Sequence, residues 1–409
     1  MSDIDFMNNL LENAEVEWRA LGDISMIYGG LTGKSKNDFE DGNASYVPYK
    51  NIFYNIAVDF DNLEAVKISN TENQREVKYG DILFTGSSES PDEAGMSSAI
   101  TQELSKPIYL NSFSFGVRFN SDIKINPHFS KYLFRSHFMR KEIIKTASGV
   151  TRFNISKARF KKIQIPIPPL NVQSEIVRIL DAFTELTAEL TAELVSRKQQ
   201  YAYYREQLLT FEENKVEWKA LGEVAEYSKT RISYELLDEK NYVGVNNLLQ
   251  DKAGKEESSH VPTQGNSTKY QDNDILIGNI RPYLKKIWQA DCTGGTNGDV
   301  LVVHPTDEAV HPRYLYQILA DDNFFNYNMQ HAKGAKMPRG DKARIMEYKI
   351  PIPSLPEQQR IVAILDKFEA LTTSLTEGLP REIALRQQQY EYYRELLLSF
   401  PKAEVVDHD

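Results

Sequence analysis

Val16-Glu17-Trp18-Arg19-Ala20-Leu21-Gly22 recurs two hundred residues later as Val216-Glu217-Trp218-Lys219-Ala220-Leu221-Gly222. Two further segments repeat in the same order. Ile165-Pro166-Ile167-Pro168-Pro169-Leu170 returns as Ile350-Pro351-Ile352-Pro353-Ser354-Leu355, and Tyr201-Ala202-Tyr203-Tyr204-Arg205-Glu206 returns as Tyr390-Glu391-Tyr392-Tyr393-Arg394-Glu395. A tandem duplication of this length predicts two equivalent modules with a pseudo-two-fold relation. Such a molecule suits a target that itself has two parts.

The composition fits two ordinary domains in a reducing compartment. The 409 residues are 41% hydrophobic and 26% charged, so each half can bury a core. The single cysteine, Cys292, excludes a disulfide framework and a cysteine-rich zinc site. The first residues do not resemble a signal peptide, and no apolar run approaches transmembrane length. The sequence therefore predicts a soluble, cytoplasmic protein without membrane contact.

The net charge of −10 argues against a nucleic-acid partner only if its distribution is ignored. Basic residues crowd one stretch of each repeat, whereas much of the acidic excess lies elsewhere, including the tail after residue 403. The crowded positions are Arg140, Lys141, Lys145, Arg152, Lys157, Arg159, Lys161 and Lys162 in the first repeat, and Arg281, Lys285, Lys286, Lys333, Lys336, Arg339, Lys342 and Arg344 in the second.

Each repeat divides into a variable mixed α/β part and a helix that resembles its counterpart. We predict an α+β protein with a first module at 1–169, a helix at 170–211, a second module at 212–354, a second helix at 355–400 and a tail at 401–409. Short apolar segments at 81–84, 113–117, 274–277 and 300–303 predict buried strands in the modules. Two similar frameworks with divergent loops indicate one task performed on two different targets.

The helices show the spacing of a coiled coil. Pro168-Pro169 and Pro356 stand at their beginnings, where proline is tolerated. Apolar positions then alternate in steps of four and three. The second helix carries four extra residues together with Gly378 and Pro380, so we predict a kink or break there and in that helix only. The predicted seam comprises Ile176, Leu180, Phe183, Leu190, Leu194, Tyr201, Tyr204, Ile361, Leu365, Phe368, Tyr390 and Tyr393.

The order of module, helix, module and helix predicts how the helices pair. Only 212–215 separates the first helix from the second module, so the first helix has a module near each end. The pseudo-two-fold relation then makes the two helices antiparallel. The similar segments at 13–16, 213–216 and 402–405 predict a circular arrangement opened once.

No convincing catalytic site emerges. Gly29-Gly30-Leu31-Thr32-Gly33-Lys34-Ser35 resembles a phosphate-binding loop, but Tyr28 stands where the first glycine belongs, which favours a simple turn. Asn126-Pro127-His128-Phe129 resembles the Asn-Pro-Pro-aromatic motif of adenine methyltransferases but lacks the second proline. The histidines show no metal-ligand spacing, and no nucleophile-base pair stands out.

DNA binding fits the residue types better. Lysine and arginine neutralise phosphates, and arginine, asparagine and glutamine read base edges. Segments 148–154 and 333–340 are rich in these types and occupy equivalent positions, whereas the basic cluster at 279–286 has no counterpart at 87–90. A solvated basic loop is the simpler interpretation of either segment alone. The candidate DNA contacts are Lys34, Lys36, Thr151, Arg152, Asn154, Lys157, Arg281, Lys285, Lys286, Lys333, Lys336, Arg339 and Lys342.

These motifs together resemble the specificity subunit of a Type I restriction-modification system. The resemblance rests on the paired Ile-Pro-Ile-Pro segments, on Ile179-Leu180-Asp181 and Ile364-Leu365-Asp366, and on the paired Tyr-x-Tyr-Tyr-Arg segments. The Thr-Ala-Glu-Leu repeat within 186–194 and Glu377-Gly378-Leu379-Pro380 resemble the branch often called IC.

The resemblance implies two target recognition domains on two antiparallel helices, each reading one half of a bipartite DNA site. It implies that the helices set the spacer and dock two methyltransferase subunits, with restriction subunits added. S-adenosylmethionine, ATP and Mg would then belong to those partners, and this chain would hold no cofactor or metal and catalyse nothing. Two other hypotheses remain: a coiled-coil scaffold with two protein-binding modules, and a nucleotide hydrolase that uses Lys34.

Overall fold

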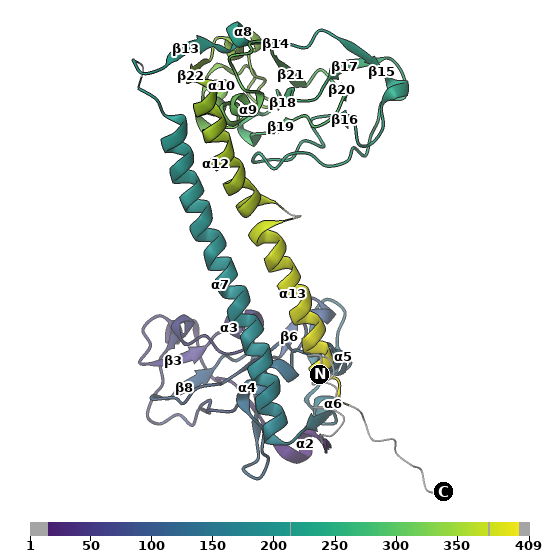
Figure 1. Ribbon diagram of the computed structural model, residues 1–409. Helices are drawn as coiled ribbons and strands as arrows, with labels where there is room; N and C mark the ends of the chain where they lie inside the picture. The colour runs from purple at the N-terminus through teal and green to yellow at the C-terminus, as the bar shows by residue number, and fades with distance from the viewer. Residues whose placement is uncertain (1–14, 213, 375–376, 401–409) are drawn as a thin grey trace, which may run out of the picture. The chain divides into compact units, whose positions relative to one another are not determined.

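The computed structural model describes residues 15–212, 214–374 and 377–400, and it divides into two compact units. Unit 1 comprises Met1–Glu189 with Ala384–Asp409, and unit 2 comprises Leu190–Ile383. Each unit therefore takes one variable module and a part of both helical regions (Figure 1). Each module packs against the beginning of one helical region and the end of the other, as a first helix with a module near each end predicts.

Unit 1 is built on a four-stranded antiparallel sheet in the order β2-β9-β5-β7. Smaller sheets pair β4-β3-β8, β10-β11-β6 and β1-β12. The strands are β1 (Glu17–Ala20), β2 (Ser25–Gly29), β3 (Ala44–Val47), β4 (Glu64–Val66), β5 (Ile82–Thr85), β6 (Ser87–Ser88), β7 (Ser97–Ala99), β8 (Ile108–Leu110), β9 (Ser114–Phe119), β10 (Ala147–Ser148), β11 (Phe153–Ile155) and β12 (Gln164–Ile167). The helices of the module are α2 (Leu21–Ile24), α3 (Tyr49–Tyr54), α4 (Pro127–Leu133), α5 (His137–Ile144) and α6 (Lys157–Phe160).

Unit 2 repeats this plan with a central sheet in the order β14-β21-β18-β19. A second sheet has the order β15-β17-β20-β16, and β13 pairs with β22. The strands are β13 (Glu217–Ala220), β14 (Ala225–Tyr227), β15 (Arg231–Ser233), β16 (Tyr242–Val243), β17 (Asn266–Tyr270), β18 (Ile275–Gly278), β19 (Ile287–Gln289), β20 (Gly294–Thr296), β21 (Val300–Pro305) and β22 (Lys349–Ile352). The helices of the module are α8 (Leu221–Val224), α9 (Pro312–Leu319), α10 (Asp322–His331) and α11 (Lys342–Met346).

The duplicated segments form corresponding elements. Trp18 lies opposite Pro166 in the β1-β12 pair, and Trp218 lies opposite Pro351 in β13-β22, so the same antiparallel ribbon precedes each long helix. The four predicted strands are confirmed as β5, β9, β18 and β21. Every residue of β5 and β18 is buried, as their continuous apolar runs require.

The helices confirm the predicted lengths and the predicted break. Helix α7 runs without interruption over Leu170–Leu209, whereas the second region consists of α12 (Leu355–Thr373) and α13 (Gly378–Leu397). Gly378 has a φ of +76°, and a Cβ there would lie 2.3 Å from the carbonyl oxygen of Ala370. A non-glycine residue at 378 would therefore be strained as well as crowded.

Within each unit, the helical segments run in opposite directions (Figure 1). Aromatic side chains make contacts between them. In unit 1, Phe183 of α7 lies 5.3 Å from Tyr393 of α13, measured between ring centroids. In unit 2, Phe368 of α12 stacks with Tyr201 and Tyr204 of α7 at 5.8 and 5.6 Å. Equivalent residues of the two repeats thus make equivalent contacts. The terminal segments 13–14 and 402–405, on which the circular arrangement also rested, lie outside the described residues.

Candidate nucleic-acid interface

The predicted segment 148–154 of unit 1 forms a hairpin at the end of the central sheet. β10 pairs with β11, with Ser148 opposite Asn154, and β11 continues onto β6, with Asn154 opposite Ser87. The amide of Ile155 donates to the carbonyl of Gly86 at 2.9 Å, directly after core strand β5. The hairpin is therefore attached to the most buried strand of the unit.

The predicted segment 333–340 of unit 2 has the same construction. Lys333 and Arg339 exchange two backbone hydrogen bonds at 2.8 and 2.9 Å. The amide of Gly340 donates to the carbonyl of Asn279 at 3.0 Å, directly after core strand β18. The two hairpins are thus bonded to the residues that directly follow the equivalent strands β5 and β18. Their equivalent positions in the two repeats predicted this correspondence.

The hairpins share a framework but not their tips. Gly149 and Gly334 follow the first paired residue and have φ values of +147° and +103°, which glycine adopts without strain. Ser156 and Asp341 cap the short helices that follow, α6 and α11, by accepting backbone hydrogen bonds. Between these fixed points stand Val-Thr-Arg-Phe-Asn-Ile in unit 1 and Ala-Lys-Met-Pro-Arg-Gly in unit 2. One backbone geometry therefore presents two different sets of side chains.

Most of the predicted DNA contacts at the hairpins are exposed. In unit 1, Arg152 places its guanidinium 6.0 Å from the ring centroid of Phe113 and donates from Nε to Ser87 Oγ at 3.1 Å. In unit 2, the amide of Arg281 donates to the carbonyl of Pro338 at 2.7 Å, which joins the 279–286 cluster to the second hairpin. The predicted residues with exposed positions are Lys36, Thr151, Arg152, Asn154, Lys157, Arg281, Lys333, Lys336, Arg339 and Lys342.

Intramolecular ion pairs hold some of these cations. Lys333 Nζ lies 2.7 Å from Asp341 Oδ2, and this hydrogen bond, with backbone donors from Arg344 and Ala343, lowers the pKa of the Asp341 carboxyl. Lys285 is half-buried and pairs with Asp322 at 2.9 Å, although its side chain remains 28% exposed. These contacts orient the lysines without removing them from solvent.

Two predicted DNA contacts require correction because their side chains are buried within the modules. Lys34 donates from Nζ to the carbonyl of Lys67 and pairs with Glu72 at 2.5 Å, and its side chain is only 5% exposed. Lys286 is 9% exposed and donates to the carbonyl of Val245 at 2.6 Å, and burial lowers its pKa. Both lysines therefore stabilise loops of their own module.

Arg135 and Arg140 of unit 1 bind backbone carbonyls within the module. Arg140 donates to the carbonyls of Gly95, Asp92 and Ala94 at 2.6–3.0 Å, and Arg135 donates to that of Ser97 at 2.7 Å. Burial lowers the pKa of each guanidinium to about 10. These two cations fasten the loop around 92–97 and do not belong to the exposed basic surface.

Replacing Lys34 by alanine should lower the thermal midpoint of the protein and leave its affinity for DNA unchanged. The substitution removes a mostly buried ion pair and leaves the carbonyl of Lys67 without its donor. Thermal unfolding and equilibrium binding to duplex DNA would be measured side by side. Lys50→Ala, at an exposed position outside the candidate DNA contacts, is the control for the charge change. Loss of DNA affinity in Lys34→Ala with an unchanged midpoint would contradict this assignment.

The residues of the predicted helix seam differ in exposure. Ile176, Leu180, Ile361 and Leu365 are fully buried in the cores of their units, as residues of a packed seam would be. Tyr204 keeps 41% of its surface exposed. The other seam residues are half-buried: Phe183, Leu190, Leu194, Tyr201, Phe368, Tyr390 and Tyr393.

The motifs that resembled catalytic loops have structural explanations. In the glycine-rich segment, Tyr28 donates its hydroxyl to Asp81 at 2.5 Å and lies in the core beside Lys34's loop. Asn126 caps α4 by accepting from the amide of His128 at 2.9 Å, and Phe129 is fully buried. Across residues 15–212, 214–374 and 377–400, no group of three or more potential metal ligands comes together.

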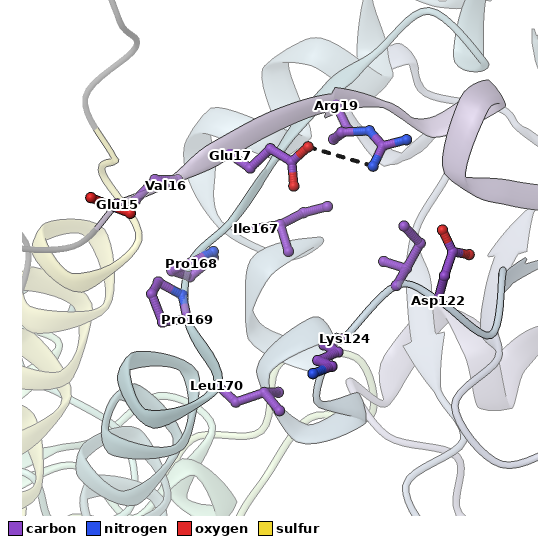
Figure 2. Close-up of a pocket in the computed structure, with 11 residues that line it drawn as sticks. Glu15, Val16, Glu17, Arg19, Asp122, Lys124, Ile167, Pro168, Pro169 and Leu170 are labelled. Atoms are coloured by element: carbon purple, nitrogen blue, oxygen red, sulfur yellow. Dashed lines mark hydrogen bonds and ion pairs between the residues drawn. The ribbon is translucent and has the colours of Figure 1, made fainter.

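A hollow of about 600 Å³ lies where α7 begins in unit 1 (Figure 2). In this view, Glu17 and Arg19 of β1 lie above the hollow, Asp122 and Lys124 lie to its right, and Pro168 and Pro169 lie to its left. An ion pair joins Arg19 to Glu17 at 3.5 Å, and the two side chains are 36% and 63% exposed. Water therefore screens this pair, and it contributes little to stability.

Comparison with known proteins identifies the family. The model of the Type I restriction modification DNA specificity domain matches residues 13–196 and again 213–385. The chain therefore belongs to the specificity subunits of Type I restriction-modification systems. The EcoR124I/EcoR124II specificity subunit of Escherichia coli is 41% identical over 62% of this chain and 67% of that protein. A putative specificity subunit of Haemophilus influenzae is 32% identical over 97% of this chain and 98% of that protein.

Solved structures show the same fold. A Type I restriction-modification S subunit from Mycoplasma genitalium aligns with a TM-score of 0.51 at 15% identity, covering 96% of this chain and 97% of that one. The HsdS subunit of Thermoanaerobacter tengcongensis aligns with a TM-score of 0.55 at 16% identity, over 94% and 95% of the two chains. None of the helices in the described part of the chain is long and apolar enough to cross a membrane.

Proposed function

We propose that this chain reads a bipartite site in double-stranded DNA, with one half-site contacted by the hairpin of each unit. The observation that carries the proposal is the pair of hairpins at 147–155 and 333–340. They have the same backbone attachment and different exposed tips. The shared backbone attachment would place both hairpin tips against DNA in the same way. Their different side chains would then select different bases.

In this proposal the chain binds DNA and partner subunits but catalyses no reaction. Two methyltransferase subunits would dock on it and restriction subunits would join them, and these partners would bring S-adenosylmethionine, ATP and Mg. Supporting this, the two motifs that resembled catalytic loops serve as a buried turn and a helix cap. The half-exposed helix residues, including Tyr204, offer apolar surface for the methyltransferase subunits.

The test is selection of duplexes from a random pool by this chain in complex with the methyltransferase subunit encoded beside it. Sequencing of the bound fraction should show two short blocks separated by a fixed gap. A variant with the hairpin tip 335–338 replaced by serines should lose one block and keep the other. Absence of any enriched motif from an intact complex would contradict the proposal and favour a protein-binding scaffold, whose binding would not depend on salt.

A further inference from the structure

An exposed ion pair joins Arg339 of the second hairpin to Asp299, the residue before β21. Nε and Nη2 of Arg339 donate to Oδ1 of Asp299 at 3.3 and 3.2 Å. The two side chains are 54% and 43% exposed, so water screens the pair and it contributes little to stability. Its position at the proposed DNA surface suggests a different purpose.

The backbone holds both residues rigidly at the end of β18. The amide of Asn279 donates to the carbonyl of Asp299 at 2.8 Å, and the carbonyl of Asn279 accepts from Gly340 at 3.0 Å. Arg339 itself is fixed by its two backbone bonds to Lys333. Because β18 is fully buried, Asp299 and Arg339 are presented from a rigid element.

The ion pair leaves one edge of the guanidinium available. Asp299 engages Nε and Nη2, whereas Nη1 of Arg339 makes no hydrogen bond within the described part of the chain. The planar edge formed by Nη1 and Nη2 matches the O6 and N7 acceptors of guanine in the major groove. We propose that Asp299 positions Arg339 to read a guanine in the half-site of unit 2. This inference rests on the proposed function.

Unit 1 supplies an internal comparison at the same place. The amide of Gly86 donates to the carbonyl of Phe113 at 2.8 Å, as Asn279 does to Asp299, so Phe113 occupies the position of Asp299. Asn154 occupies the position of Arg339 in the hairpin. The carboxylate and the arginine are thus both absent from this position of unit 1, which predicts that the guanine contact is confined to one half-site.

The test uses the intact complex with the methyltransferase subunit and the duplex that selection yields. Each guanine of the two blocks is replaced in turn by 7-deazaguanine, which lacks the N7 acceptor. For the unmodified protein, one position in one block should lower affinity by about 10-fold. Arg339→Ala removes every donor of the side chain, so its affinity should be insensitive to that replacement. Asp299→Ala should reduce the discrimination, because the guanidinium is no longer oriented.

Arg344→Ala is the matched control, since Arg344 is also exposed and paired, with Glu347 at 2.6 Å. It should discriminate like the unmodified protein. Discrimination by Arg339→Ala equal to that of the unmodified protein at every guanine would show that Arg339 contacts no guanine N7 and would overturn the inference. So would the absence of any guanine sensitive to 7-deaza replacement. In both cases the two-block motif would remain, whereas failure to select any motif would refute the proposed function itself.

Discussion

Replacing Gln358 by leucine should lower the free energy of unfolding by about 3 kcal/mol, because this buried side chain satisfies three backbone groups. Gln358 is fully buried at the first turns of α12. Its Oε1 accepts from the amide of His311 at 2.8 Å, and its Nε2 donates to the carbonyls of Ala309 and Pro353 at 2.9 and 2.8 Å. Leucine would fill the space and leave one donor and two acceptors without partners.

The repeat supplies a second test of the same contact. Gln173 accepts from the amide of Asn126 at 2.7 Å and donates to the carbonyls of Lys124 and Pro168 at 3.0 and 2.7 Å. Gln173→Leu should therefore destabilise unit 1 as Gln358→Leu destabilises unit 2. Denaturant unfolding would be compared with that of Gln199→Leu, at an exposed position of α7. Equal stability of all three variants would show that the hydrogen bonds of the two buried glutamines add nothing.

The sequence predicted the main elements of the fold but not the hydrogen bonds of these two glutamines. The strands around 82–85 and 275–278, the starts of both long helices and the break before Gly378 follow from local patterns, and the structure confirms them. Gln173 and Gln358 stand three residues before Ile176 and Ile361, on the apolar seam, in both repeats. A polar residue that recurs at the same seam position in both repeats was the available signal. The amides that bond to the two glutamines, those of Asn126 and His311, lie 47 residues away in the chain.

The candidate site was predictable in its location more than in its members. Comparison of the two repeats predicted both hairpins, because the segments 148–154 and 333–340 occupy equivalent positions in the repeats. Lys34 and Lys286 were wrong as DNA contacts, since burial of a lysine depends on tertiary neighbours that composition does not reveal. Phe113 and Asp299 were missed, because they reach the hairpins only through the pairing of central strands. The sharing of each helical region between the units follows from the predicted antiparallel pairing, but the residues at which the regions pass from one unit to the other depend on packing, which no local pattern encodes.

Inserting one additional Thr-Ala-Glu-Leu unit after Leu190 should lengthen the spacer between unchanged half-sites by about one or two base pairs. Four residues add roughly 6 Å to an α-helix, and a base pair occupies about 3.4 Å. The insertion falls where α7 passes from one unit to the other and where no residue of 182–200 is fully buried, so it should not disturb either core. Four residues also turn the helix by only about 40° beyond a full turn, which a coiled-coil seam tolerates as a stutter.

Selection from a random pool would measure the gap directly for the insertion variant, for deletion of 191–194 and for the length-preserving control Glu189→Gln. We expect a longer gap, a shorter gap and no change, respectively. Affinity of the insertion variant for the original site should fall by at least about 100-fold, because one half-site moves out of register and several base contacts are lost together. The half-sites themselves should stay the same, since both hairpins are attached to core strands that the insertion does not touch. An identical gap in all three variants would show that α7 does not set the spacing, and the spacer would then have to be determined by the docked partner subunits.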